Sequence, residues 1–248
     1  MLQNFESLVF AWLCLGFLTF ITLLKIPAPY GKFSKTNWGP MIPSKLGWIV
    51  MEIISPLALL YFFLKGNMEV TPTNITFITL WSLHYFNRSI IYPLRQNNPA
   101  KMPLLIATLA FLFNIVNGYV NGTYLGSIKA YSIEYMSNWN FILGVCLFIV
   151  GAYINIKSDN ILLSLRSKSG EYKIPEGFMF KYVSFPNYLG EILEWAAFAL
   201  MTWSIGGLSF MIWTMANLVP RAIKGHQWYH SKFESYPKDR KAIFPFII

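Results

Sequence analysis

The hydrophobic positions of this chain form seven long runs, and short polar segments separate them. The runs lie near residues 6–24, 46–64, 74–92, 103–121, 140–158, 188–204 and 207–224. A helix needs roughly 20 mostly apolar residues to cross a bilayer, and each run is close to that length. The pattern predicts an all-α integral membrane protein with seven transmembrane helices and with its two termini on opposite sides of the membrane.

The basic residues are concentrated in every second segment between these runs. Loops that are translocated across a membrane are depleted in Lys and Arg, and the segments 25–45, 88–101, 157–181 and 221–241 hold eighteen of the twenty. Only Lys65 and Lys129 fall on the other side. The asymmetry places the C-terminus in the cytoplasm and the N-terminus outside. Because no basic residue precedes Lys25, we interpret the first run as a retained span and not as a cleaved signal peptide.

The composition excludes a soluble protein, because 55% of the residues are hydrophobic and only 12% are charged. A soluble domain has about 25% charged residues. The net charge of +9 lies in short loops between apolar runs, and it therefore does not form the wet basic face that nucleic acid requires. Cys14 and Cys146 lie inside apolar runs, which disfavours a disulfide framework. With no internal repeat, residues 1–248 are expected to form a single domain.

Ionisable side chains lie inside several of these runs, where each costs on the order of 2.5–3.5 kcal/mol on insertion scales. Glu52 lies near the start of the second run, and His84, Tyr85 and Arg88 lie in the third. Spacings of three and four residues place the imidazole, the phenol and the guanidinium on one broad helix face. A structural interhelical bond explains Glu52 as well as a functional role does, and interfacial anchoring explains Arg88 and Tyr92. Tyr85 lies about two turns deeper.

Three later runs carry polar stripes at their cytoplasmic ends. The stripes consist of Asn155, Asp159 and Arg166; of Asn187, Glu191 and Glu194; and of Arg221 with Tyr229. The planar fork of arginine matches phosphate oxygens in pairs. The stripes therefore favour a phosphate-bearing ligand that enters from the cytoplasm with its reactive end in an apolar chamber. A network of structural ion pairs explains the same spacing equally well.

Several common ligand motifs are missing from the sequence. It contains neither a G-x-G-x-x-G turn after a strand nor a G-x-x-x-x-G-K-[ST] loop, so a nucleotide would not be held by a Rossmann unit or a P-loop. His226 and His230 are four residues apart, but they lack both the glutamate of a zinc-protease helix and a third ligand. We therefore expect no bound metal.

Five strings of the sequence resemble one known family. They are L-H-Y-F-N-R-S-I-I-Y-P, N-I-K-S-D-N-I-L-L-S-L-R, Y-K-I-P-E-G, N-Y-L-G-E-I-L-E-W and H-Q-W-Y-H-S-K-F-E-S-Y-P-K-D-R-K-A-I-F-P-F. From A-P-Y-G-K, which begins at residue 28, to the C-terminus, the chain resembles the steroid 5α-reductase family. The resemblance implies a monomeric seven-helix membrane protein, open to the cytoplasm, that reduces the Δ4 double bond of a 3-oxo steroid with NADPH. The short loops favour a bacterial member in the inner membrane; a eukaryotic one would lie in the endoplasmic reticulum.

The resemblance also implies roles for individual residues. The catalytic glutamate and tyrosine of the family fall on Glu52 and Tyr85, both expected to bind the steroid 3-oxo group. Its cofactor residues fall on Lys32, Arg88, Tyr92, Asn155, Asp159, Arg166, Tyr172, Asn187, Glu191, Arg221 and Tyr229. Two positions depart from the family pattern. Met51 stands where the family often has Gln, which bears on the carbonyl contacts and the substrate, and Gly225 precedes His226 where a His pair is common, which bears on one cofactor contact.

The implied chemistry delivers a hydride to C5 of an enone, and negative charge then develops on the carbonyl oxygen. Hydrogen-bond donors that are aimed at this oxygen stabilise the charge. A neutral Glu52 can donate, and Tyr85 can donate or act as a general acid. The partners implied are an apolar steroid from the membrane, NADPH from the cytoplasm and the lipid bilayer, with neither nucleic acid nor metal.

Two other functions remain open from the sequence. Related membrane reductases share the C-terminal pattern, so the alternative substrate is another apolar enone, of the polyprenol type or a 2-enoyl thioester. A proton-coupled transporter would use Glu52, Glu191 and Glu194 as a relay. Transporters of that kind commonly have inverted repeats, and the sequence has none.

Overall fold

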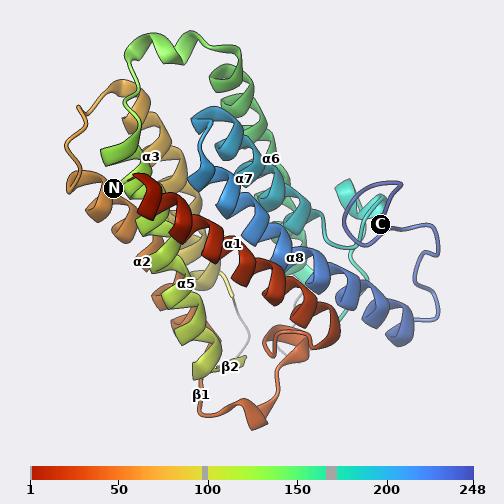
Figure 1. The fold of residues 1–248 in the computed structure, drawn as a ribbon. Coiled ribbons are helices and arrows are strands. Elements are labelled where there is room, and N and C mark those ends of the chain that lie inside the picture. The colour runs from red at the N-terminus through yellow and green to blue at the C-terminus, as the bar shows by residue number, and fades with distance from the viewer. Residues whose placement is uncertain (1, 97–99, 166–171) are drawn as a thin grey trace.

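Long helices that run alongside one another make up most of the molecule, as the computed structural model shows for residues 2–96, 100–165 and 172–248 (Figure 1). The long helices are α1 (Leu2–Lys25), α2 (Ser44–Leu64), α3 (Pro72–Phe86), α5 (Leu104–Thr123), α6 (Trp139–Leu165), α7 (Pro186–Thr202) and α8 (Ile205–Lys232). Each of the seven predicted runs coincides with one of these helices, and in the third run α3 continues through a π-helical turn η3 (Asn87–Ile91) into α4 (Tyr92–Leu94).

Among the residues that the structure describes, four segments are long and apolar enough to cross a membrane. They are Leu2–Lys25, Ser44–Leu64, Leu104–Ile128 and Trp139–Leu165, where α5 continues through a second π-helical turn η4 (Tyr124–Ile128). The chain is therefore a mostly helical membrane protein. The remaining long helices, α3, α7 and α8, carry the polar residues discussed above, which lowers their mean hydropathy. Figure 1 shows the two termini at opposite ends of the bundle.

A small sheet is the main departure from the all-α prediction. Strand β1 (Met41–Pro43) pairs antiparallel with β2 (Lys101–Pro103), with Ile42 opposite Met102. Each strand ends in proline, and the residue before a proline favours extended backbone. The sheet ties together the two segments that lead into α2 and α5.

Helices α2 and α5 pack at very close range. The stripe of Gly118 and Gly122 on α5 and Gly126 on η4 faces α2, and a Cβ atom built on Gly122 would lie 3.0 Å from the Cβ of Phe62. Small residues at helix interfaces allow such close backbone approach in membranes. The packing holds the residues of α2 at a fixed height beside those of α5.

Helices α6 and α7 also approach closely, at Gly151 and Gly190. A Cβ atom on Gly190 would lie 2.5 Å from the backbone nitrogen of Asn155 and 2.6 Å from the carbonyl oxygen of Gly151. This close approach brings the polar stripe of α6 against that of α7.

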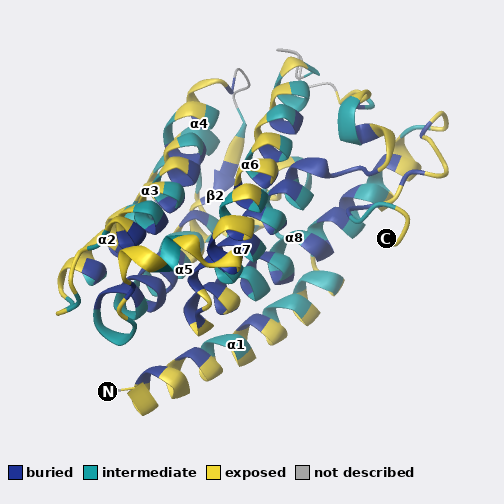
Figure 2. Cartoon of the chain, turned by 90° about the horizontal axis from the view of Figure 1, so that it is seen from above, coloured by how far each residue is buried: buried dark blue, intermediate teal, exposed yellow. Residues whose placement is uncertain are grey.

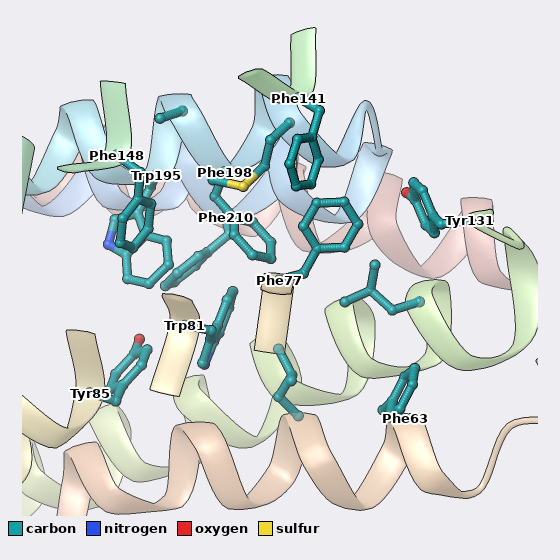
Figure 3. Close-up of a cluster of buried hydrophobic side chains, with 14 residues drawn as sticks. Phe63, Phe77, Trp81, Tyr85, Tyr131, Phe141, Phe148, Trp195, Phe198 and Phe210 are labelled. Carbon is teal, nitrogen blue, oxygen red and sulfur yellow. The ribbon is translucent and has the colours of Figure 1, made fainter. Parts of the chain in front are cut away.

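An aromatic cluster fills the centre of the bundle. Phe77 and Trp81 of α3 pack against Trp195, Phe198 and Phe210 of α7 and α8 (Figure 3). Tyr85 lies at one end of this cluster in Figure 3. By contrast, α1 lies along the outside of the bundle with exposed residues along most of its length (Figure 2).

Candidate active site

Three helices bring Glu52, Tyr85 and Asn114 together. The hydroxyl of Tyr85 on α3 donates a hydrogen bond to Oδ1 of Asn114 on α5, at 3.2 Å. Nδ2 of Asn114 donates to the backbone carbonyl of Met51 on α2, at 2.6 Å. The Asn114 side chain also interacts with the neighbouring Glu52 carboxyl. The two predicted catalytic residues therefore meet at one buried amide, which the sequence analysis did not select.

A buried imidazole and carboxylate lie beside this group. Nδ1 of His84 lies 2.9 Å from Oε2 of Glu194, and both side chains are almost fully buried. Trp195 packs edge-on against the His84 ring, at 4.6 Å between centroids. The second oxygen of Glu194, Oε1, is buried without a hydrogen-bond partner among the described residues. The pair links α3 to α7 directly next to Tyr85.

An ion pair and two amides form the next layer towards the predicted cytoplasmic end. Nη1 of Arg88 donates to Oδ2 of Asp159 at 3.0 Å, and Nδ2 of Asn187 donates to Oδ1 of the same carboxylate at 3.0 Å. Nδ2 of Asn155 donates to the backbone carbonyl of Asn187 at 2.9 Å. These four residues were all predicted to contact the cofactor, and the structure brings them into one network.

The π-helical turn η3 contains Arg88. Such turns occur frequently at functional sites, and in this one the Arg88 side chain is buried. Its Cζ lies over the rings of Trp48 and Tyr92, at 5.0 and 4.9 Å from their centroids. Glu191, half-buried on α7, also interacts electrostatically with Arg88 and with Glu52.

Arg221 organises the end of the site next to the segment after α1. Its Nε donates to the hydroxyl of Tyr188 at 3.0 Å, and its Nη2 donates to the carbonyl of Tyr30 at 3.1 Å. The guanidinium lies 3.5 Å above the centre of the Tyr30 ring. A small cavity is lined by Leu23, Pro27, Ala28, Tyr30, Asn217 and Arg221. Burial raises the pKa of the Tyr30 phenol to about 12, and the nearby Arg221 charge opposes this shift.

Lys32 lies in an aromatic enclosure next to Arg221. Its Nζ lies 4.3 Å from the ring centre of Tyr229 and 4.7 Å from those of Phe185 and Trp228, and it donates to the carbonyl of Gly225 at 3.3 Å. Burial, and then repulsion from Arg221, lowers the pKa of Lys32 to about 7. The ammonium group therefore loses its proton near neutral pH.

The remaining predicted residues lie at the edges of this arrangement. Tyr172 is 41% exposed and packs against Trp228, with centroids 5.0 Å apart. Tyr229 is buried and stacks on Tyr236. Arg166 lies outside the described residues. His226 bonds Ser184 through Nδ1 at 2.6 Å and lies 3.2 Å from His230, and within the described ranges no three His, Cys, Asp or Glu side chains form a group that could hold a metal.

Sequence reasoning missed several residues of the site. Asn114 belongs to a stripe with Asn117 and Asn121 in an otherwise apolar run, and amides spaced three and seven residues apart were a signal that could have selected it. Trp48 and Tyr30 carry no comparable signal, because an isolated aromatic residue near a membrane interface is ordinary.

The geometry combines two chemical environments. One end holds hydroxyl and carboxyl groups that can donate to a carbonyl oxygen, next to an aromatic cluster that excludes water. The other end holds Lys32, Arg88 and Arg221, which suit an anionic ligand. A ligand that spans both would place an anionic part at the cationic end and a reactive part beside Tyr85.

Comparison with known proteins gives consistent matches. The profile of the family described as 3-oxo-5-alpha-steroid 4-dehydrogenase matches residues 100–248. The steroid 5-alpha-reductase DET2 of Solanum lycopersicum is 42% identical, over 98% of this chain and 96% of the relative. The 3-oxo-5-alpha-steroid 4-dehydrogenase 1 of Rattus norvegicus is 38% identical over 94% and 92%, and that of Homo sapiens is 38% identical over 88% and 85%.

Proposed function

Because the chain belongs to the 3-oxo-5-alpha-steroid 4-dehydrogenase family, we propose that it reduces the Δ4 double bond of 3-oxo-Δ4 steroids to 5α products with NADPH. The observation that carries this proposal is the position of Tyr85 and Glu52, which share one buried amide next to a cluster of aromatic side chains. Members of such a family need a nicotinamide cofactor as the hydride source. We propose NADPH as this nicotinamide cofactor because of the cationic residues at the other end of the site.

The residues at the cationic end fit this cofactor. Oδ1 of Asn187 is buried and accepts no hydrogen bond from any described residue, although Nδ2 of the same amide donates to Asp159. An unsatisfied buried acceptor costs about 1–3 kcal/mol, and an amide N–H such as that of a carboxamide would satisfy it. We propose that Asn187, Asn155, Asp159 and Glu191 bind the nicotinamide end. When bound, the cofactor supplies the hydride.

Phosphate groups would then lie against the basic residues. We propose Arg88, Arg166, Arg221 and Lys32 for this role, with Tyr92, Tyr172 and Tyr229 lining the same region. The fork of Arg221 is held by Tyr188 and by two backbone carbonyls, so its orientation is set before a ligand arrives.

The substrate carbonyl is handled by Tyr85 and Glu52. Hydride addition at C5 breaks the C4–C5 double bond and moves an electron pair onto the 3-oxo oxygen, and a proton added at C4 completes the reduction. The Tyr85 hydroxyl and a neutral Glu52 carboxyl donate to the oxygen as its charge grows. The rings of Trp81 and Trp195, which pack near Tyr85 at 5.6 and 5.8 Å, exclude water and so strengthen these bonds.

The membrane arrangement belongs to the same proposal. All seven long helices cross the bilayer, with the N-terminus outside and the C-terminus in the cytoplasm, and residues 1–248 act as one monomeric reductase unit. The steroid arrives from the lipid phase and NADPH from the cytoplasm. Because the polar faces of α3 with η3, α6 and α7 point at one another through the His84–Glu194 and Arg88–Asp159 pairs, lipid does not contact these charges.

Three variants test the proposal with one matched control. Tyr85→Phe removes a donor to the developing oxyanion, which costs about 10²–10³ in rate, and NADPH should stay bound. Glu52→Gln retains a donor, whereas Glu52→Ala does not, so the ratio of their turnovers reports whether donation is needed. Tyr131→Phe is the control, because that buried hydroxyl bonds the Thr202 carbonyl away from the site.

Steroid turnover and bound NADPH are measured for each purified variant. Tyr131→Phe should keep near-parental turnover even if its thermal stability falls. Near-parental turnover in stable Tyr85→Phe would reject the mechanism. Turnover of an enoyl thioester but not of a 3-oxo-Δ4 steroid by the parent protein would reject the substrate.

A further inference from the structure

Asn114 lies where α2, α3 and α5 meet, and it is 4% exposed. Its Oδ1 accepts from the Tyr85 hydroxyl at 3.2 Å, and its Nδ2 donates to the Met51 carbonyl at 2.6 Å. The same side chain interacts with the Glu52 carboxyl. One amide therefore contacts both groups that we assign to the carbonyl oxygen of the substrate.

These contacts fix the orientation of the amide. Nδ2 must face α2, because the Met51 carbonyl can only accept, and Oδ1 consequently faces Tyr85. A phenol has one proton, so in the ligand-free protein this proton points at Oδ1 of Asn114. The arrangement defines both the position of the Tyr85 hydroxyl and the direction of its proton.

The other asparagines of α5 behave differently. Nδ2 of Asn117 bonds the Phe113 carbonyl and Nδ2 of Asn121 bonds the Asn117 carbonyl, both within their own helix, and Oδ1 of Asn117 accepts from Nε1 of Trp12 on α1 at 3.4 Å. Asn114 alone among these three uses its amide to join α2 to α3. Its role is therefore not the general one of an asparagine that satisfies itself in an apolar helix.

We propose that Asn114 is a positioning residue for carbonyl activation, an inference that rests on the proposed function. It holds the Tyr85 hydroxyl at a set distance from Glu52, so that both donors converge on one carbonyl oxygen. When the carbonyl binds, Tyr85 transfers its hydrogen bond from Oδ1 of Asn114 to the substrate oxygen. No covalent bond forms or breaks at Asn114 itself.

The Asn114 amide is important because the residue before Glu52 on α2 is a methionine. Met51 is buried and has no side-chain donor, so α2 brings no amide of its own next to Glu52. Asn114 supplies the amide from α5 and anchors it on the Met51 backbone. The anchor depends on the close packing of α2 and α5 around Gly118 and Gly122.

The test compares two positions on one helix. Asn114→Leu keeps the approximate volume and removes every polar contact, Asn114→Ala is the second variant, and Asn117→Leu and Asn117→Ala are the matched controls. A misplacement of about 1 Å at a reacting group can cost about 10²-fold in rate. We expect kcat to fall about 10- to 100-fold in the Asn114 variants, with KM and NADPH affinity within about threefold of the parent.

A solvent deuterium isotope effect separates positioning from a structural role. A misdirected Tyr85 proton makes proton donation slower, so the isotope effect on kcat should rise in the Asn114 variants and stay at the parental value in the Asn117 variants. A purely structural role would lower the yield or the melting temperature and leave the isotope effect unchanged.

The outcomes are distinct from those that test the function. Parental kcat and isotope effect in either folded Asn114 variant would overturn the inference, as would an equal loss in the Asn117 variants. Absence of steroid turnover in the parent would instead overturn the proposed substrate. The same comparison would then be made on an enoyl thioester, because its carbonyl oxygen would accept the same hydrogen bond from Tyr85.

Discussion

Replacing Gly225 with alanine should destabilise the protein, because the space beside this residue is occupied. A Cβ atom at this position would lie 2.7 Å from Cε2 of Phe185, closer still to its Cζ, and 3.0 Å from Nζ of Lys32. The Phe185 ring is buried and stacks on Tyr188, with centroids 5.1 Å apart and planes at 15°. The ring cannot rotate aside without disturbing α7.

The free energy by which Gly225→Ala destabilises the protein follows from these distances. Carbon atoms pack at about 3.5–4.0 Å, so the ring edge must move by about 1 Å to admit a methyl group. Overpacking of a buried site costs about 1–3 kcal/mol, and replacing glycine by alanine inside a helix recovers about 1 kcal/mol. At the upper end of the first range, Gly225→Ala should destabilise the protein by about 1–2 kcal/mol.

Thermal unfolding measures the loss of stability, and NADPH titration measures the effect on cofactor binding. For a chain of this size the melting temperature should fall by about 2–8 °C. NADPH affinity should fall as well, because Lys32 and Phe185 both move. Gly206→Ala is the control on the same helix, since its nearest neighbour, Oδ1 of Asn121, would lie at 3.2 Å and need move by only a few tenths of an ångström, so its loss of stability should be smaller than that of Gly225→Ala.

A second substitution tests whether the Phe185 ring causes the loss of stability. Phe185→Leu removes the ring edge that meets the new methyl group, so Gly225→Ala should cost less in the Phe185→Leu background. Contacting residues couple by about 0.5–3 kcal/mol in such cycles. Additive effects of the two substitutions, or a Gly225→Ala variant with parental stability and NADPH affinity, would refute the reasoning.

Three further outcomes are expected. Asp159→Asn removes the carboxylate that pairs with the buried Arg88 guanidinium, and because Glu191 still acts on this charge, the loss in thermal unfolding should lie at the lower end of about 3–5 kcal/mol; a loss below about 1 kcal/mol would show that the pair is dispensable. Since Lys32 has a pKa of about 7 when NADPH is absent, it is neutral at higher pH, and NADPH affinity should fall between about pH 7 and 9 in titrations. The NADPH affinity of Lys32→Arg should not change over that pH range. An equal fall in both proteins would exclude Lys32 as the cause of the pH dependence. Reporters fused to the two termini should show them on opposite sides of the membrane, and two signals from one side would reject seven spans.

The positions of the helices could be predicted from the sequence alone. The run 46–64 lies within α2, and the run 74–92 lies within the helical segment formed by α3, η3 and α4. This was possible because the preference of a segment for lipid is the sum of its own side chains, and no distant residue is needed to evaluate it. The same locality explains why the short strands β1 and β2 were missed: their pairing joins residues about sixty positions apart.

The sequence also selected Glu52, Tyr85 and the polar stripes, because charges inside apolar runs stand out wherever they occur. It could not identify what each group contacts. Asn114 is one of three similar amides on α5, and only the crossing of α2, α3 and α5 distinguishes it from Asn117. The same holds for Asp159, whose two oxygens are shared between Arg88 of η3 and Asn187 of α7.

The enclosure around Lys32 illustrates what tertiary structure decided. Nζ of Lys32 bonds the Gly225 carbonyl across 193 positions of sequence, and the rings around it come from Phe185, just before α7, and from Tyr229 on α8. Gly225 had been noted only as a departure from a family pattern, whereas in the structure it is the space that Phe185 and Lys32 occupy. Hydropathy and spacing are local properties and determine the helices and their polar faces. Partners and pKa values depend on which faces meet, and that is decided by packing over the whole chain.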